Sequence, residues 1–137
     1  MALAVLVADQ ATKWLALEFL SSVSTVPVIP GVFHLTLVRN SGVAFGLFQG
    51  YGLWITLGTL AVLAGLFRAT LRPGGSQWAP FCLALILGGA IGNLMDRMRF
   101  GGVIDFLDFR IWPVFNLADS CITVGAALLA VSFWRKS

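Results

Sequence analysis

The chain has few of the side chains on which most enzyme chemistry depends. Only 11% of its 137 residues are charged, and it has one histidine, two cysteines and one tyrosine. Cys82 and Cys121 both lie in apolar segments without other metal-binding residues nearby, so neither a disulfide nor a zinc site is expected. Ser120 and Cys121 have no histidine near them in the sequence, because His34 is the only one. This disfavours a serine or cysteine protease.

Positive charge is sparse as well. Nine Lys and Arg residues against six Asp and Glu residues give a net charge of +3, and the basic residues are scattered rather than clustered. Nucleic acid is therefore not an expected partner. Hydrophobic residues make up 58% of the chain, above the roughly 45–50% that is usual in soluble domains. Their concentration in blocks indicates membrane spans rather than one soluble core.

Four apolar segments come close to the length of about 20 residues that a membrane-spanning helix needs. They are residues 1–20, 51–71, 77–95 and 116–134. We expect a single integral-membrane domain over residues 1–137, with both termini on the same side. The first segment lacks the positive start and the cleavage site of a secretory signal, so it is expected to be a retained helix. The arginine distribution favours cytoplasmic termini, with the two long connections outside.

The two long connections predict extended structure. Residues 21–50 alternate β-branched and other residues and are broken by Pro27, Pro30 and Gly31. Residues 99–113 are similarly apolar and extended in pattern. Because backbone polar groups cannot remain unpaired in lipid, these segments are expected to pair with each other or to lie at the membrane surface, with Trp112 as an interfacial anchor.

Five of the six acidic side chains are aspartates in or beside these segments, where a carboxylate costs at least about 2.5–3.5 kcal/mol at mid-helix. They are Asp9, Asp96, Asp105, Asp108 and Asp119. On the expected topology four of them gather with Asn40 and Asn93 at one membrane face, while Asp9 lies about halfway along the first span. An ion pathway would distribute polar groups through the bilayer and show internal repeats, so an active site at the surface is favoured over a transporter. A non-enzymatic scaffold leaves the clustering unexplained.

Three of these aspartates each allow two interpretations. Asn116 and Asp119 have the spacing of a helix N-cap and its third residue, so Asp119 is either a cap or a carboxylate that the helix dipole keeps ionised as a base. Asp105 and Asp108 are three residues apart in an extended segment, so they point to opposite faces and only one would enter a given cavity. Two carboxylates that meet can hydrolyse a peptide bond by sharing one proton, without a serine or cysteine nucleophile.

Two other charged pairs are expected to be structural. Asp9 and Lys13 are four residues apart in the first span, which predicts an intrahelical ion pair. Asp96 and Arg97 predict a charge cluster at the end of the third span. The small residues before that cluster allow close helix packing, and they are Gly88, Gly89 and Gly92.

Five sequence blocks, in order and over nearly the whole chain, resemble those of the lipoprotein signal peptidase (signal peptidase II) family. They are residues 9–13, 39–45, 88–97, 102–106 and 115–119. The resemblance implies a membrane all-α fold with four transmembrane helices, a small extracytoplasmic β-structure (a β-cradle) and an extended outer loop. It implies an aspartyl endopeptidase of the bacterial cytoplasmic (inner) membrane, with its active site near the extracytoplasmic face. Such an enzyme removes the signal peptide from diacylglyceryl-modified prolipoproteins by cleaving before the lipidated cysteine.

The same resemblance assigns roles to residues. Asp105 and Asp119 match the catalytic pair that activates water. The matching supporting residues are Asn40, Asn93, Asp96, Arg97, Asn116, Asp9 and Lys13. The resemblance implies no metal or other cofactor, a monomer in contact with membrane phospholipid and the lipid-modified signal peptide, and sensitivity to the cyclic peptide antibiotic globomycin. Only eight residues precede Asp9, fewer than family members usually have, so the first helix is expected to insert less stably.

Overall fold

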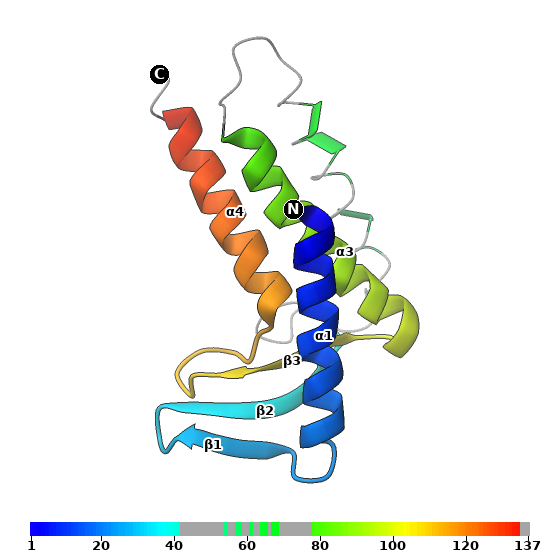
Figure 1. The fold of residues 1–137 in the computed structure, drawn as a ribbon, viewed down its shortest axis with the longest axis vertical. Helices are drawn as coiled ribbons and strands as arrows, with labels where there is room; N and C mark the ends of the chain where they lie inside the picture. The colour runs from blue at the N-terminus through cyan, green and yellow to red at the C-terminus, as the bar shows by residue number, and fades with distance from the viewer. Residues whose placement is uncertain are drawn as a thin grey trace.

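The computed structural model places long helices above a small sheet (Figure 1). It describes residues 1–41 and 78–134 and, between them, only the single positions 54, 57, 58, 61, 64, 65, 67 and 68. The predicted span over residues 51–71 therefore lies outside the described residues, apart from those positions. The described elements are α1 (Ala2–Leu20), β1 (Thr25–Ile29), β2 (Phe33–Asn40), α3 (Ala79–Phe100), β3 (Val103–Asp108) and α4 (Leu117–Trp134).

The helix ends agree with the sequence predictions for α1 and α4, but α3 is longer than predicted. The prediction ended the third span at residue 95, whereas α3 continues to Phe100. Its end is set by Gly101, which adopts a left-handed conformation (φ 70°) and donates its N–H to the carbonyl oxygen of Arg97. Asp96 and Arg97 do not end the helix. The first residues of the predicted extended segment 99–113 are consequently helical.

The described helices differ in how well they suit a membrane. α3 is long and apolar enough to cross one, and α4 contains a shorter apolar stretch, Leu117–Ser132. α1 carries Asp9, Lys13 and Glu18. The described fold is mostly helical with a small antiparallel sheet. The predicted number of four membrane-spanning helices stays a prediction.

Small residues allow α3 to pack closely against both of its helical neighbours, as the glycine pattern predicted. A side chain at Gly88 would collide with Val5 of α1, and one at Gly89 would collide with the carbonyl oxygen of Ala118 in α4. Between α3 and α4, buried apolar side chains form a core. Its members are Ala79, Cys82, Ile86, Ala90 and Leu129. The three helices therefore lie close together, near the polar residues of each helix.

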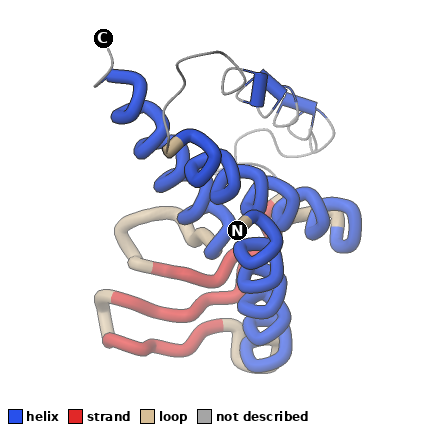
Figure 2. Tube along the Cα trace, turned by 45° about the horizontal axis from the view of Figure 1, so that its top comes forward, coloured by secondary structure: helices blue, strands red, loops and turns tan. Residues whose placement is uncertain are grey.

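The sheet has the order β1-β2-β3 with antiparallel pairing throughout. It lies where α1 and α3 end and α4 begins, as Figures 1 and 2 show. The predicted pairing of the two long connections is confirmed, because Asn40 of β2 pairs with Val103 of β3. Phe106 of β3 packs with Ala16 and Leu20 of α1. The sheet is thus fixed to α1 through β3.

Candidate active site

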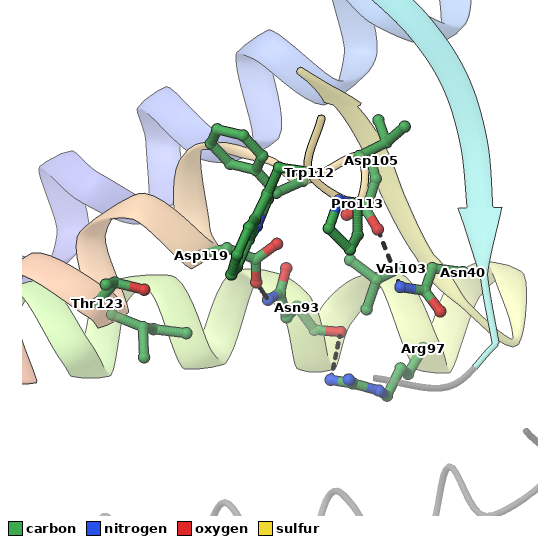
Figure 3. A pocket seen from close by; sticks show the side chains of 12 residues that line it. Asn40, Asn93, Arg97, Val103, Asp105, Trp112, Pro113, Asp119 and Thr123 are labelled. Atoms are coloured by element: carbon green, nitrogen blue, oxygen red, sulfur yellow. Dashed lines mark hydrogen bonds between the residues drawn. The ribbon is translucent and has the colours of Figure 1, made fainter. Parts of the chain in front are cut away.

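A pocket of about 290 Å³ opens between α3, the start of α4 and the β3–α4 loop (Figure 3). Five of the predicted site residues line it: Asn40, Asn93, Arg97, Asp105 and Asp119. The rest of the lining is mostly apolar and consists mainly of residues 112–115, which we call the apolar wall. The structure thus brings together, from four separate elements, polar side chains that are up to 79 positions apart in the sequence (Asn40 to Asp119).

Asp105 reaches the pocket from the middle of β3, where it is only 2% exposed. Its Oδ1 accepts a hydrogen bond from Asn116 Nδ2 (2.7 Å) and its Oδ2 accepts one from Asn40 Nδ2 (3.1 Å). The pKa of Asp105 is raised to about 7, chiefly by burial and next by the negative charge of Asp119, while the hydrogen bonds from Asn40 and Asn116 lower it. Near neutral pH this carboxyl is therefore able to carry a proton.

Asp119 forms the helix cap that the sequence allowed, and it also lines the pocket. Its backbone N–H donates to Asn116 Oδ1 (2.9 Å), and its own Oδ2 accepts from the backbone N–H of Asn116 (3.3 Å). This is a reciprocal cap at the start of α4. Its Oδ1 accepts a hydrogen bond from Asn93 Nδ2 (2.8 Å) and lines the pocket. The cap fixes the carboxylate at the position from which it faces the cavity.

Asn116 connects the two carboxylates and is fully buried. Its Nδ2 donates to Asp105 Oδ1 and to Asn93 Oδ1 (3.1 Å), while its backbone and Oδ1 form the cap with Asp119. One side chain therefore sets the position of both Asp105 and Asp119. The sequence predicted the capping role of Asn116. Its contact with Asp105 could be seen only in the structure.

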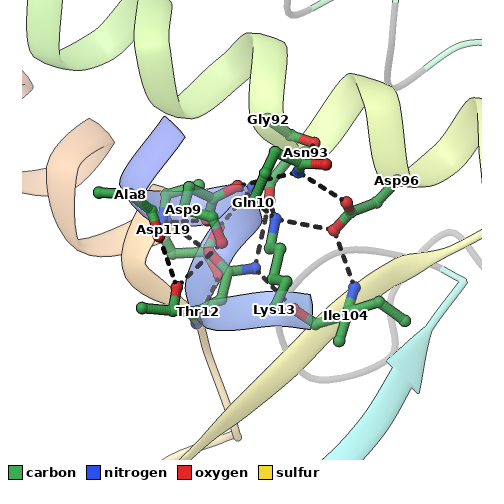
Figure 4. A network of polar contacts seen from close by, with 12 residues as sticks. Ala8, Asp9, Gln10, Thr12, Lys13, Gly92, Asn93, Asp96, Ile104 and Asp119 are labelled. Atoms are coloured by element: carbon green, nitrogen blue, oxygen red, sulfur yellow. Dashed lines mark hydrogen bonds and ion pairs between the residues drawn. The ribbon is translucent and has the colours of Figure 1, made fainter. Parts of the chain in front are cut away.

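A second group of charges, Asp9, Lys13 and Asp96, lies near Asn93, one of the pocket residues (Figure 4). We refer to these three residues as the buried charge cluster. Lys13 Nζ lies 2.9 Å from Asp9 Oδ2 and 2.7 Å from Asp96 Oδ2, and it donates to Asn93 Oδ1 at 2.8 Å. The predicted Asp9–Lys13 pair is confirmed. Asp96, predicted to cluster with Arg97, has its ion pair with Lys13 because α1 packs directly against α3 at this level.

The buried charge cluster also holds the backbone next to each pocket aspartate. Asp96 Oδ2 accepts the backbone N–H of Ile104 (3.1 Å), the residue before Asp105. Asp9 Oδ1 accepts the backbone N–H of Ala118 (3.0 Å), the residue before Asp119. The cluster therefore anchors β3 and α4 immediately beside the two carboxylates. Nothing in the sequence pointed to these contacts, because backbone donors carry no sequence signal.

Asp108 is not among the described residues that line this pocket. Thr36 Oγ1 and Arg110 Nη1 donate to its Oδ2, at 2.8 and 3.1 Å, and the backbone N–H of Arg110 donates to its Oδ1 at 2.8 Å. Although burial raises it, these hydrogen bonds lower the pKa of Asp108 below its ordinary value. The prediction that only one of Asp105 and Asp108 enters a given cavity is consistent with this placement.

The apolar wall is the part of the pocket that the sequence did not predict. Trp112 was expected to anchor the chain at the membrane surface, and in the structure it lines the pocket while remaining 59% exposed. The sequence feature that could have indicated the apolar wall is its position, since residues 112–115 come directly before Asn116 and the helix cap. Within the part of the chain that the structure describes, no group of three or more His, Cys, Asp or Glu side chains is arranged to hold a metal ion.

Comparison with known proteins gives one consistent result. A family model described as Signal peptidase (SPase) II matches residues 1–135. A protein named lipoprotein signal peptidase from Halothermothrix orenii is 46% identical over 134 residues, covering 98% of this chain and 92% of its own. A protein of the same name from Pelotomaculum thermopropionicum is 45% identical over 135 residues, covering 97% of this chain and 88% of its own.

Solved structures agree with the sequence matches. A structure described as a bacterial membrane enzyme, at 2.3 Å resolution, superposes with a TM-score of 0.86 and 29% sequence identity, covering 98% of this chain and 85% of that one. A second, described in the same words at 1.9 Å, gives a TM-score of 0.80 and 30% identity, covering 99% and 91%. With the family match extending over residues 1–135, the chain belongs to the signal peptidase II family.

Proposed function

We propose that this protein is a membrane-embedded lipoprotein signal peptidase in which Asp105 and Asp119 form the catalytic pair. Membership of the family, and near-full-length relatives named lipoprotein signal peptidases, support cleavage of signal peptides from prolipoproteins. The single observation that carries the mechanism is that Asp105 and Asp119 line one pocket and are bridged by Asn116. The proposed substrate is diacylglyceryl-modified, and the bond that breaks precedes the lipidated cysteine.

In the proposed reaction the two carboxyl groups share one proton. The ionised Asp119 takes a proton from water, whose oxygen attacks the scissile carbonyl carbon, while the protonated Asp105 donates its proton to the carbonyl oxygen. The tetrahedral intermediate then collapses. Asp119 gives its proton to the leaving nitrogen, and Asp105 recovers a proton from a hydroxyl of the intermediate as the new carbonyl forms. Both carboxyl groups thereby return to their starting states.

The surroundings of the two carboxyl groups support this division of roles. Burial raises the pKa of Asp105 to about 7, which suits a group that must hold a proton near neutral pH. Asp119 accepts hydrogen bonds from Asn93 Nδ2 and from the backbone of Asn116 at the start of α4. Amide donors and the positive end of a helix dipole favour an ionised carboxylate. We therefore assign the shared proton at rest to Asp105.

The remaining pocket residues suit a peptide that arrives from lipid. The apolar wall of residues 112–115 lines the same pocket as the polar side chains, and the pocket lies beside α3, which is long and apolar enough to cross a membrane. Arg97 and Asn40 supply hydrogen-bond donors on the polar side. The active site is proposed to face the extracytoplasmic side of the bacterial cytoplasmic membrane, with the enzyme a monomer among phospholipids.

A cleavage assay on purified protein in detergent tests the proposal. The substrates are a prolipoprotein with the diacylglyceryl group on its cysteine and the same prolipoprotein without it. We expect cleavage of the lipidated form, and replacement of either carboxyl by the isosteric amide, in Asp105→Asn or Asp119→Asn, should lower kcat by about a hundredfold to ten-thousandfold. Mass spectrometry of the products locates the broken bond.

The control is Glu18→Gln, the same change from carboxylate to amide at an exposed position of α1. It should cleave like the wild type. Full activity in either Asp105→Asn or Asp119→Asn would contradict the two-aspartate mechanism, while equal cleavage of the unlipidated substrate would contradict the proposed substrate class.

A further inference from the structure

Asp108 holds a short chain of polar contacts that crosses the sheet. Thr25 Oγ1 and Thr36 Oγ1 share a hydrogen bond of 2.8 Å between β1 and β2, and Thr36 Oγ1 donates to Asp108 Oδ2. Asp108 in turn accepts the backbone N–H of Arg110. Asp108 is 4% exposed although Phe109, directly after it, is 44% exposed. The chain of contacts therefore runs from the β1–β2 hairpin to the first residues of the β3–α4 loop.

A shift in strand register explains why Asp108 and Asp105 have different partners on β2. Thr36 and Asn40 are four residues apart and would share a face of a regular strand, but Asp108 and Asp105 are three apart and face opposite ways. The pairing of β2 with β3 shifts between Leu35 and Val38. The extra residue on β2 reverses its alternation, so that Thr36 meets Asp108 and Asn40 meets Asp105.

Two further contacts close the loop that follows. The backbones of Leu107 and Phe115 exchange hydrogen bonds of 2.8 and 3.1 Å, which join the base of the loop. The ring of Phe109 lies between those of Phe33 and Phe115, with centroid distances of 4.9 and 5.9 Å. At the turn, Arg110 adopts a left-handed conformation (φ 66°). That conformation is unfavourable for a residue with a side chain, and the hydrogen bond from its N–H to Asp108 opposes its relaxation.

We propose that Asp108 is a positioning residue that holds the apolar wall of the pocket, residues 112–115, against the bound substrate. The inference rests on the proposed function, since it concerns the same pocket. Asp108 does not touch the reacting atoms. By fixing Arg110 it fixes where the loop turns, and by accepting from Thr36 it ties that turn to β2. Loss of the carboxylate releases the wall and weakens substrate binding, while the carboxyl pair stays in place.

The test measures KM and kcat on the lipidated prolipoprotein for Asp108→Ala, Asp108→Asn and Thr36→Val. Removing hydrogen bonds to a charged acceptor in Asp108→Ala should raise KM about tenfold and leave kcat within about twofold of the wild type. The pH dependence of kcat, set by Asp105 and Asp119, should not change. Asp108→Asn should be milder, because its amide oxygen can still accept the Arg110 N–H. Thr36→Val removes the hydrogen bonds of Thr36 to Asp108 and to Thr25 but leaves the Arg110 contacts of Asp108, and it should raise KM about threefold.

Hydrogen exchange followed by mass spectrometry gives a readout that does not depend on activity. In Asp108→Ala the amides of residues 109–114 should exchange faster, with those of α3 unchanged. An unchanged KM in Asp108→Ala, a loss confined to kcat, or equal damage from Asn and Ala would each overturn the proposal. If Asp108→Ala does not fold, Thr36→Val decides by the same two criteria. A wild type that cleaves no prolipoprotein would instead refute the proposed function, and exchange at residues 109–114 would still decide whether Asp108 holds the loop.

Discussion

Two groups of aspartates lie side by side in this protein and have opposite surroundings. In the buried charge cluster, Asp9 and Asp96 share the ammonium of Lys13. At the pocket, the hydrogen bonds to Asp105 and Asp119 come instead from the neutral amides of asparagine side chains and from backbone. A full opposite charge compensates buried carboxylates and makes them structural. Amide donors carry no net charge, so they orient a carboxyl and still leave it able to exchange a proton.

Asn93 connects the buried charge cluster to the pocket aspartates. Its Oδ1 accepts from Lys13 Nζ and its Nδ2 donates to Asp119 Oδ1. Because an ammonium can only donate, Lys13 determines which end of the Asn93 amide faces it and hence which end faces Asp119. The buried charge cluster thus orients a carboxylate of the pocket through the Asn93 amide.

The largest effect should come from removing the ammonium on the structural side. Lys13→Met leaves two buried carboxylates unpaired, and breaking a buried ion pair in this way costs about 3–5 kcal/mol. We expect a corresponding fall in the free energy of unfolding, measured by denaturant titration in detergent. Adding Asp9→Asn and Asp96→Asn to Lys13→Met should recover part of it. A loss below about 1 kcal/mol in Lys13→Met would show that the cluster does not depend on its cation.

On the catalytic side, the rate should depend on pH through Asp105. The proposed mechanism requires this carboxyl to be protonated, and its pKa is raised to about 7. As the pH rises above that value the protonated fraction falls, so kcat/KM should decline about tenfold for each pH unit. A pH–rate profile between pH 5 and about 9 measures it. An activity that instead rises through pH 7 and then stays level would reverse the assignment and make Asp105 the base.

The fold and the site were predictable to different degrees. The spacing of Asn116 and Asp119 predicted the cap, and alternation along the strand predicted that Asp105 and Asp108 would separate, because both depend on local geometry. The naming of Asp105 and Asp119 as a pair depended on the family resemblance. The contact of Lys13 with Asp96 depends on how closely α1 approaches α3, which glycines allow but do not specify.

The errors also have physical causes. The third span was ended at Asp96 and Arg97 because charges were taken as the membrane boundary, whereas a helix needs a conformational stop, and Gly101 supplies it. That Trp112 lines the pocket was not predicted, because an aromatic residue in an apolar loop suits an interface as well as a pocket wall. Its place at the membrane surface stays a prediction.

Asp105→Asn and Asp108→Asn, two substitutions on β3, should change the free energy of unfolding with opposite dependence on pH. In the folded protein the pKa of Asp105 is raised from 3.8 to about 7, so the wild type loses stability as the pH rises between these values. Asp105→Asn removes this loss and should gain relative to the wild type over that range. The pKa of Asp108 is lowered, so its carboxylate stabilises the fold at neutral pH and loses that effect in acid. Asp108→Asn should therefore cost more at neutral pH than in acid.

Thermal unfolding of both variants and the wild type, from about pH 4 to about pH 8, measures these differences. The two substitutions are chemically identical and lie three residues apart on β3, so each is the control for the other. If the stability of the two variants changed with pH in the same direction, the contrast between Asp105, whose pKa is raised, and Asp108, whose pKa is lowered, would be wrong.

The smallest expected effect tests the packing that brings the structural group together. A methyl group at Gly92 would press against Asp9 Oδ2. Gly92→Ala should therefore cost about 1–3 kcal/mol in overpacking, partly offset by about 1 kcal/mol of helix propensity. At Gly65 an added Cβ meets nothing within 4 Å, so Gly65→Ala is the control and should be neutral or slightly stabilising. If Gly92→Ala behaved like Gly65→Ala in thermal unfolding, Asp9 could shift without loss, and its hydrogen bond to the Ala118 N–H would not be what holds the start of α4 at the pocket.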